Sequence, residues 1–198
     1  MTDEHAPCQL NTDRLTPWQR AVVDNPSRYL IVQGGSACGK THAVLAAIVK
    51  QALAHPGCTC VYSSYGLHLR SAQAGLLGIL AGQPDAGDLV SSISTNPPVV
   101  YLVNGSQICF IQYDQVREQT MGRDITYAAA DMDNPVDIRP LSTHFGCRVA
   151  MTIGGHWDIV RADIPQRSWI ESVQASPDGL YRRMLEGDWS GAEEKGPP

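Results

Sequence analysis

The chain has 198 residues, which suits one domain with a sizeable core, and its 43% hydrophobic and 18% charged residues are ordinary for a globular protein. The formal net charge of −5 gives no overall basic field, which argues against a protein that grips nucleic acid by itself through many phosphates. The longest apolar runs, such as residues 43–49, are too short to span a membrane, and no secretory signal opens the chain, so we expect a cytosolic protein.

The six cysteines show no repeated spacing, and Cys58-Thr59-Cys60 is the one tight pair. His55 lies nearby, but a zinc site needs a second pair of ligands at a suitable distance, and the sequence offers none. We expect free thiols that pack as small apolar side chains.

The first part of the chain alternates helix and strand. Residues 1–14 are polar and unpatterned, so we expect a flexible N-terminal segment. Thr16 is a suitable N-cap for a short helix that has Pro17 at its first position. The apolar run 28–33 ends in glycines and predicts a buried strand, and an alanine-rich helix is expected over 40–54.

The middle of the chain continues the alternation and then departs from it. A strand is expected over 58–63 and a helix over 67–80. Residues 82–98 are rich in Gly, Pro, Asp and Ser and indicate a surface excursion. The strands expected over 99–103 and 107–112 flank Asn104-Gly105, which is a strong hairpin signal.

Two more strands are expected where apolar runs occupy 124–130 and 148–153. Residues 164–175 are loop-like to helical, and 178–186 are expected to be helical. Strands that alternate with helices imply an α/β fold, a three-layer sandwich with a mainly parallel sheet and an inserted β-hairpin. We place the domain at 15–191, followed by a polar tail at 192–198.

A glycine-rich stretch connects the first long strand to the first long helix. Its sequence, Gly-Gly-Ser-Ala-Cys-Gly-Lys-Thr over 34–41, has the spacing of the phosphate-binding loop of P-loop NTPases. Backbone N–H groups and the helix N-terminus would face the phosphates, Lys40 would reach the β- and γ-phosphates, and Thr41 would offer its hydroxyl to Mg²⁺. The expected binding residues for ATP are therefore Gly34, Gly35, Ser36, Ala37, Cys38, Gly39, Lys40 and Thr41.

A second Mg²⁺ ligand is expected at the end of a neighbouring strand. The apolar run before Asp131 ends in this carboxylate, so Asp131 is the candidate acid on the metal side, acting through a water. Gln19 precedes the first strand by about ten residues, and a glutamine amide can both donate to and accept from an adenine edge.

With these motifs placed, residues 15–191 resemble the ATPase domain of the large terminase subunit, the DNA-packaging motor of tailed bacteriophages. Residues 15–19 look like the family's adenine-recognising Q motif, so the resemblance implies that Gln19 contacts adenine. Residues 34–41 match its phosphate loop. Residues 151–157 look like the family's coupling motif, which implies that Thr152 senses the γ-phosphate and transmits hydrolysis to movement.

Three further segments resemble that family. They are the hairpin at 103–108, the run into the second acidic motif at 122–131, and the end of the ATPase domain at 181–189. The family's nuclease domain should follow residue 191, but the chain stops at Pro198. Either the chain is truncated or the ATPase is encoded separately, and we expect no nuclease activity from it.

The hydrolytic residues depart from the family pattern at two places. Met132 stands where the family has a glutamate that orients the attacking water, and a thioether cannot do that. Asp133 and Glu118 are the candidate substitutes.

The second departure concerns a positive charge near the γ-phosphate. The family often carries an arginine inside the phosphate loop, near the position that Ser36 occupies here. That role would fall to Arg123, to Arg148 or to a neighbouring subunit.

The resemblance implies an ATP-driven translocase of double-stranded DNA with low intrinsic turnover, working in the host cytoplasm and transiently at the procapsid portal. Its implied partners are further copies of the chain in a ring, the viral portal and the small terminase subunit, with a separate nuclease subunit left open and no membrane. One alternative is a nucleotide-binding module with a degenerate hydrolytic site that acts in assembly or regulation, which Met132 and Ser36 favour. Another is an unrelated P-loop enzyme such as a small-molecule kinase, against which the hairpin and the absence of an arginine-rich lid count.

Overall fold

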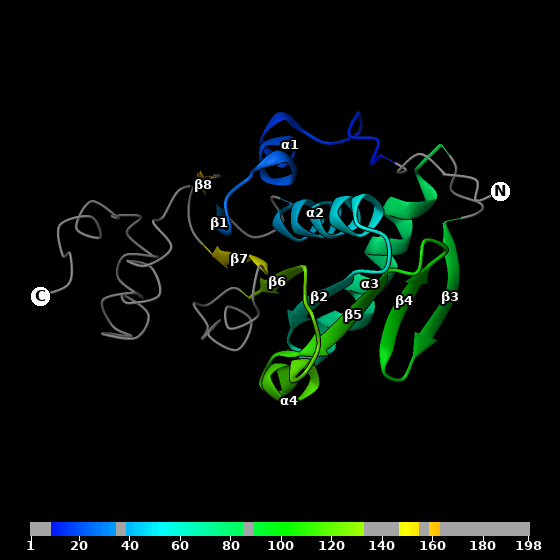
Figure 1. Ribbon diagram of the computed structural model, residues 1–198. Helices are drawn as coiled ribbons and strands as arrows, with labels where there is room; N and C mark the ends of the chain where they lie inside the picture. Colours follow the sequence, from blue (N-terminus) through cyan, green and yellow to red (C-terminus); the bar gives the residue numbers. More distant parts are fainter. Residues whose placement is uncertain (1–8, 35–38, 85–88, 133–146, 155–158, 163–198) are drawn as a thin grey trace, which may run out of the picture.

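The computed structural model describes residues 9–34, 39–84, 89–132, 147–154 and 159–162, which form one mixed sheet flanked by helices (Figure 1). The sheet order is β3-β4-β5-β2-β6-β7-β1-β8. The strands are β1 Tyr29–Gly34, β2 Thr59–Ser64, β3 Val90–Thr95, β4 Pro98–Leu102, β5 Gln107–Gln112, β6 Tyr127–Asp131, β7 Arg148–Gly154 and β8 Ile159–Ala162. The helices are α1 Pro17–Asp24, α2 Lys40–Ala54, α3 Gly66–Ala81 and α4 Val116–Thr120, the last preceded by a 3₁₀ turn over Tyr113–Gln115.

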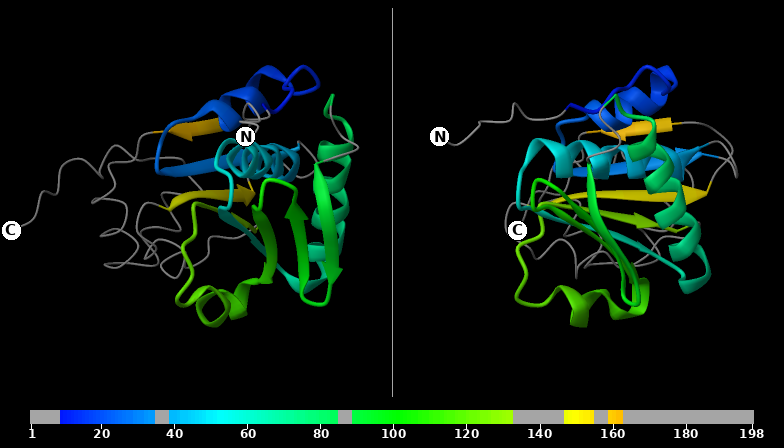
Figure 2. Two further views of the ribbon diagram at one scale, coloured as in Figure 1. Left: turned by 45° about the vertical axis from the view of Figure 1, so that its right-hand side comes forward. Right: turned by 90° about the vertical axis from the view of Figure 1, so that its right-hand side faces the viewer.

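The five central strands β5, β2, β6, β7 and β1 are parallel, and the outer strands on both sides are antiparallel to their neighbours. Helices lie on both faces of this sheet: α1, α2 and α3 cover one face, and α4 lies against the other (Figures 1 and 2). The predicted fold class is therefore confirmed as a three-layer α/β sandwich with a mainly parallel sheet and an inserted hairpin.

The central elements are buried because both faces of the sheet are covered. β2 is buried along its whole length, and the alanines of β6 at 128–130 are fully buried, with α2 packed against this strand. Such strands show an apolar run rather than an alternating pattern, which is why the sequence indicated them. α2 is buried along most of its length, and this packing fixes the position of its first residues, Lys40 and Thr41.

α1 begins as the sequence predicts. Thr16 is its N-cap and Pro17 its first residue, and Thr16 forms a capping box with Gln19. In this box Gln19 N donates to Thr16 Oγ1 at 3.4 Å, while Thr16 N donates to Gln19 Oε1 at 3.0 Å.

The inserted unit has three strands, not two. The hairpin predicted around Asn104-Gly105 is confirmed as β4 and β5, but the predicted surface excursion at 82–98 also contains a strand, β3, which pairs with β4 at the edge of the sheet. β3 is largely exposed and consists mostly of Ser and Thr, so it has no hydrophobic pattern by which the sequence could reveal it. β8 and α4 were also missed because each is very short.

Several expectations fall outside the described residues. These are the first eight residues of the flexible segment expected at 1–14, the helical stretches at 164–175 and 178–186, and the tail at 192–198. In the part of the chain that the structure describes, no helix is both long and apolar enough to cross a membrane. The cysteines in that part, Cys58, Cys60, Cys109 and Cys147, are free thiols, as expected.

Candidate nucleotide-binding site

A pocket of about 430 Å³ opens at the edge of the sheet where the parallel strands end. Because the carboxyl ends of parallel strands meet at one edge, this is where ligands bind in open α/β sheets. The pocket is lined by the first residues of α2, the last residues of β2 and β6, and the first half of α3. It brings Lys40 and Thr41 together with Asp131, which lies far from them in the sequence and which we predicted to act with them.

Gly39 belongs to the predicted phosphate loop and is the N-cap of α2. Its φ of 96° lies in the left-handed region, and a Cβ at this position would lie 2.7 Å from Gln19 Nε2. The backbone conformation requires glycine here, and a Cβ would in addition displace the end of the Gln19 side chain. Gly39 lines the pocket, whereas the predicted loop residues Gly35, Ser36, Ala37 and Cys38 lie outside the described residues.

The N-terminus of α2 faces the pocket and carries no acidic residue in its first turn. The partial positive charge of this helix end is therefore not offset by a carboxylate of its own first turn, which favours an anion in the pocket. Lys40 is only 7% exposed and lines the same pocket. A phosphate bound there would meet the ammonium largely out of water, where charge-assisted contacts are strong.

Asp131 is held by side chains from the strands on both sides of β6. Tyr62 Oη on β2 donates to one carboxylate oxygen, Oδ2, at 2.6 Å, and Thr152 Oγ1 on β7 donates to the other, Oδ1. Ser64 Oγ donates to the backbone oxygen of Asp131 at 2.7 Å. Burial and the neighbouring Asp131 charge raise the pKa of Tyr62, so its phenol stays a protonated donor.

Thr152, assigned only through the coupling motif, lies directly beside the predicted metal-side acid. It is the register partner of Asp131 across β6 and β7 and is 1% exposed. Its hydroxyl donates to Asp131 and accepts from Met132 N at 3.1 Å. Its assignment as a sensor of the γ-phosphate stays a prediction.

The pocket offers donors that suit Mg²⁺. Thr41 contributes a hydroxyl and Asp131 a carboxylate, and Mg²⁺ prefers such oxygen ligands. Each Asp131 oxygen accepts one hydroxyl, which leaves lone pairs for waters of a hydrated ion. Among the described residues no group of three His, Cys, Asp or Glu could hold a metal by itself. A Mg²⁺ held here would therefore depend mainly on nucleotide phosphates and water, which is its usual manner of binding.

Gln19, assigned to adenine by resemblance, joins α1 to the end of the phosphate loop. Its amide oxygen belongs to the capping box, and its Nε2 donates to Gly39 O at 3.3 Å. The side chain is largely buried, and one amide hydrogen and one oxygen lone pair remain beyond these contacts. Contact with adenine stays a prediction.

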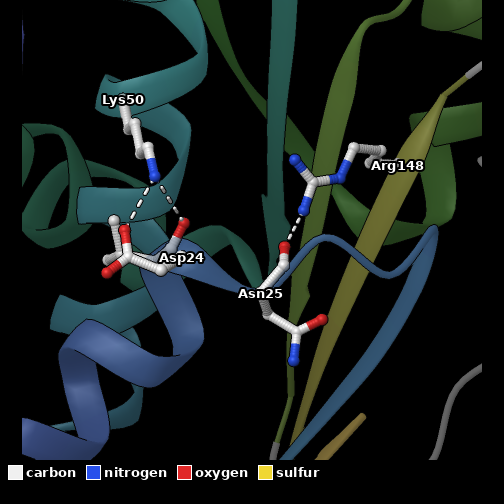
Figure 3. Close-up of polar contacts among 5 residues, drawn as sticks. Asp24, Asn25, Lys50 and Arg148 are labelled. Atoms are coloured by element: carbon white, nitrogen blue, oxygen red, sulfur yellow. Dashed lines mark hydrogen bonds and ion pairs between the residues drawn. The ribbon is translucent and has the colours of Figure 1, made fainter. Parts of the chain in front are cut away.

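Neither candidate arginine lines the pocket of its own chain. Arg123 precedes β6, and its Nη1 lies 3.7 Å from Cys109 Sγ, in the layer on the other side of the sheet from α2. Arg148 begins β7 at the amino end of the strand, where it donates to the backbone oxygen of Asn25 (Figure 3) and to that of Ser27. The role of either arginine near the γ-phosphate stays a prediction.

Neither Asp133 nor Glu118, the candidates for orienting the attacking water, is a described residue of the pocket. Met132 is 2% exposed and buried, and Asp133 lies outside the described residues. Glu118 is exposed on α4, which packs on the opposite face of the sheet, and it does not line the pocket.

The polar residues of the pocket that were not predicted from the sequence include His42, Tyr62, Ser64 and His68. His42 follows Thr41 directly, so its place beside the pocket could have been predicted from the glycine-rich motif at 34–41. The other three come from β2 and α3, and they could be found only once β2 was known to lie beside β6.

No family model and no curated protein matches the sequence. Solved structures do match. The ATPase domain of the large terminase of Thermus phage P74-26 aligns with a TM-score of 0.55 at 13% identity, covering 88% of this chain and 93% of that domain. The large terminase of bacteriophage HK97 aligns with a TM-score of 0.59 at 18% identity, covering 84% of this chain and 38% of that protein.

These alignments confirm the resemblance to large terminase ATPase domains at the level of the fold. At such low identities the likeness establishes the arrangement of helices and strands and does not carry over an activity. The chain spans the length of the isolated P74-26 domain but well under half of the HK97 protein.

Proposed function

We propose that this chain is the ATP-binding and hydrolysing motor domain of a viral DNA-packaging terminase large subunit, which couples ATP hydrolysis to translocation of double-stranded DNA. The observation that carries the proposal is the pocket that unites Lys40, Thr41 and Asp131 in a fold shared with large terminase ATPase domains.

In the proposed site each residue has a separate task. The N-terminus of α2 and the Lys40 ammonium bind the β- and γ-phosphates. Thr41 and Asp131 hold Mg²⁺, which neutralises charge on the phosphate oxygens when it is bound. Thr152 contacts Asp131 and reports the state of the γ-phosphate to β7, while Gln19 contributes to adenine recognition.

Hydrolysis needs two further groups, one that orients the attacking water and one that brings positive charge to the γ-phosphate. The described residues of one subunit place neither group in the pocket. Met132 replaces the water-orienting glutamate, for which Asp133 is the nearest substitute, and no described arginine lines the pocket. An arginine supplied by a neighbouring subunit is worth about 10³ to 10⁵ in rate in P-loop enzymes. The isolated chain therefore turns over slowly and gains activity in a homo-oligomeric ring, in which Arg123 or Arg148 of one subunit serves the next.

We propose for this chain the partners that its resemblance to large terminase subunits implies. These are double-stranded DNA, the viral portal and the small terminase subunit in the host cytoplasm, with nuclease activity residing outside this chain. A second candidate function is an assembly or regulatory module that binds ATP without turnover, and the burial of a methionine at position 132 favours it. Tight binding with no turnover in the presence of DNA would identify that alternative.

Calorimetric titration of ATP into Lys40→Ala tests the proposal. Loss of a charge-assisted contact costs about 1.5–3 kcal/mol, so we expect ATP affinity to fall roughly 10- to 150-fold while the fold is kept. Lys50→Ala is a matched control, because Lys50 lies on the same helix but pairs with Asp24 at 2.7 Å away from the pocket (Figure 3). Equal ATP affinity of the Lys40→Ala and Lys50→Ala proteins would refute the assignment of the phosphate loop.

A further inference from the structure

We propose that Tyr62 is a positioning residue for the metal site: together with Thr152 it fixes the carboxylate of Asp131 in the orientation that receives hydrated Mg²⁺ with ATP. This inference rests on the proposed function. The two hydroxyl groups and the carboxylate that they hold form a carboxylate clamp.

The clamp holds Asp131 from two sides. β6 lies between β2 and β7, and the donors come from these two flanking strands. Tyr62 is in register with Ala129, two residues before Asp131, so the side chains of Tyr62 and Asp131 point to the same face of the sheet. Each oxygen of the carboxylate accepts one hydroxyl, so rotation of the carboxylate would break both hydrogen bonds.

Tyr62 is itself rigidly placed. It is 1% exposed, and its ring packs against that of Phe110 on β5 with ring centroids 5.6 Å apart. The backbone is held as well, because Ser64 Oγ donates to Asp131 O and Met132 N donates to Thr152 Oγ1. A carboxylate fixed in this way keeps its free lone pairs in constant directions.

Fixed directions matter for Mg²⁺ in particular. This ion demands near-octahedral geometry and retains several waters, so a ligand that binds it through water must hold that water in place. Removal of a hydrogen-bond partner that orients a metal ligand typically costs 10- to 100-fold in metal affinity or activity. Loss of the Tyr62 hydroxyl should therefore weaken the response to Mg²⁺ without weakening the direct contacts to the phosphates.

The test is a titration of Mg²⁺ into protein and a fluorescent ATP analogue, repeated with the analogue in EDTA. For Tyr62→Phe we expect the Mg²⁺ concentration at half-maximal binding to rise about 10-fold or more, while binding of the analogue in EDTA stays at the wild-type level. Tyr127→Phe is the matched control, because it removes the hydroxyl of another buried tyrosine at the opposite end of β6. This control should leave both quantities unchanged.

Two further variants separate positioning from simple loss of packing. Thr152→Val removes the other donor and should shift the Mg²⁺ midpoint in the same direction. In an Asp131→Asn background, Tyr62→Phe should add nothing, because the carboxylate that it orients is gone. An additional shift in that background would overturn the inference.

The outcomes distinguish this inference from the proposed function. Absence of nucleotide binding by the wild-type chain would contradict the proposed function. Binding that depends on Mg²⁺, with the same midpoint in Tyr62→Phe as in wild type, would overturn the role of Tyr62 and leave the function standing. Should Tyr62→Phe not fold, Thr152→Val decides instead, and an unchanged Mg²⁺ midpoint in that variant overturns the clamp.

Discussion

Gly39 both begins α2 in a left-handed backbone conformation and lines the pocket. Its left-handed conformation starts α2 beside the pocket, and the space that a side chain would need is taken by Gln19. The same Gln19 side chain takes part in the capping box of α1. One amide group therefore links α1 to Gly39, the N-cap of α2. The glycine is therefore required by its backbone conformation, independently of any ligand in the pocket.

Replacement of this glycine gives a first stability prediction. Gly39→Ala should lower the free energy of unfolding by about 1–3 kcal/mol, because alanine is strained at positive φ and its Cβ displaces Gln19. Gly78→Ala is the control with the opposite sign. Gly78 lies in the interior of α3, and a methyl group added to it would meet no heavy atom within 4 Å, so alanine should stabilise the helix by about 0.5–1 kcal/mol. Urea unfolding in which Gly39→Ala is as stable as wild type would contradict this account.

The sequence predicted some residues of the pocket and missed others for a physical reason. Lys40, Thr41 and Asp131 follow from local signals, namely a glycine-rich turn and an apolar run that ends in a carboxylate. Tyr62 and Ser64 carry no such signal, because their role depends on which strand lies beside β6. Strand order is a property of the whole sheet, and one short segment does not encode it.

At the scale of elements, the turn between β4 and β5 also provides hydrogen-bond donors for the C-terminal end of α2. The last carbonyl groups of a helix have no partner within it and must find one elsewhere. Asn104 Nδ2 donates to Ala52 O at 2.8 Å, and Ser106 Oγ lies 3.0 Å from both Ala52 O and His55 O. The hairpin turn thus caps the helix whose other end lines the pocket, which links the inserted unit to the site through α2.

This contact gives a prediction for the hairpin. Asn104→Ala removes the bond to Ala52 O and the bond from Ser106 N to Asn104 Oδ1, so the free energy of unfolding should fall by about 1–2 kcal/mol. Gln119→Ala, which removes an exposed side-chain hydrogen bond on α4, should change it by no more than about 0.5 kcal/mol. Equal midpoints for the two variants in urea would show that the turn does not stabilise the end of α2.

The elements themselves were predicted where burial leaves a pattern. β1, β2, β5, β6 and β7 are core strands with apolar runs, and α2 and α3 have long helical sequences, so all were found. β3 was missed because an edge strand of serines and threonines gains its structure from pairing with β4 rather than from burial. The Asn-Gly pair nonetheless marked the hairpin, because its turn needs glycine at positive φ.

At the scale of the whole molecule, the sheet order explains how the site is assembled. β7 lies between β1, which precedes the predicted phosphate loop, and β6, which ends in Asp131. A residue on β7 is therefore placed between the loop and the acid, and Thr152 occupies that place with its hydroxyl on Asp131. The candidate arginines Arg123 and Arg148 make their contacts away from this edge, and this is why we propose that either would act on the ATP of a neighbouring subunit.

The rate of ATP hydrolysis per subunit, measured against protein concentration with and without double-stranded DNA, tests the proposed motor function most directly. We predict turnover well below about 1 s⁻¹ for the dilute chain, a rise when concentration and DNA promote assembly, and loss of activity in Lys40→Ala. A dilute chain that already turns over at about 1 s⁻¹ or faster would contradict completion of the site by a neighbouring subunit. No turnover at any concentration, with DNA present, would contradict the motor itself.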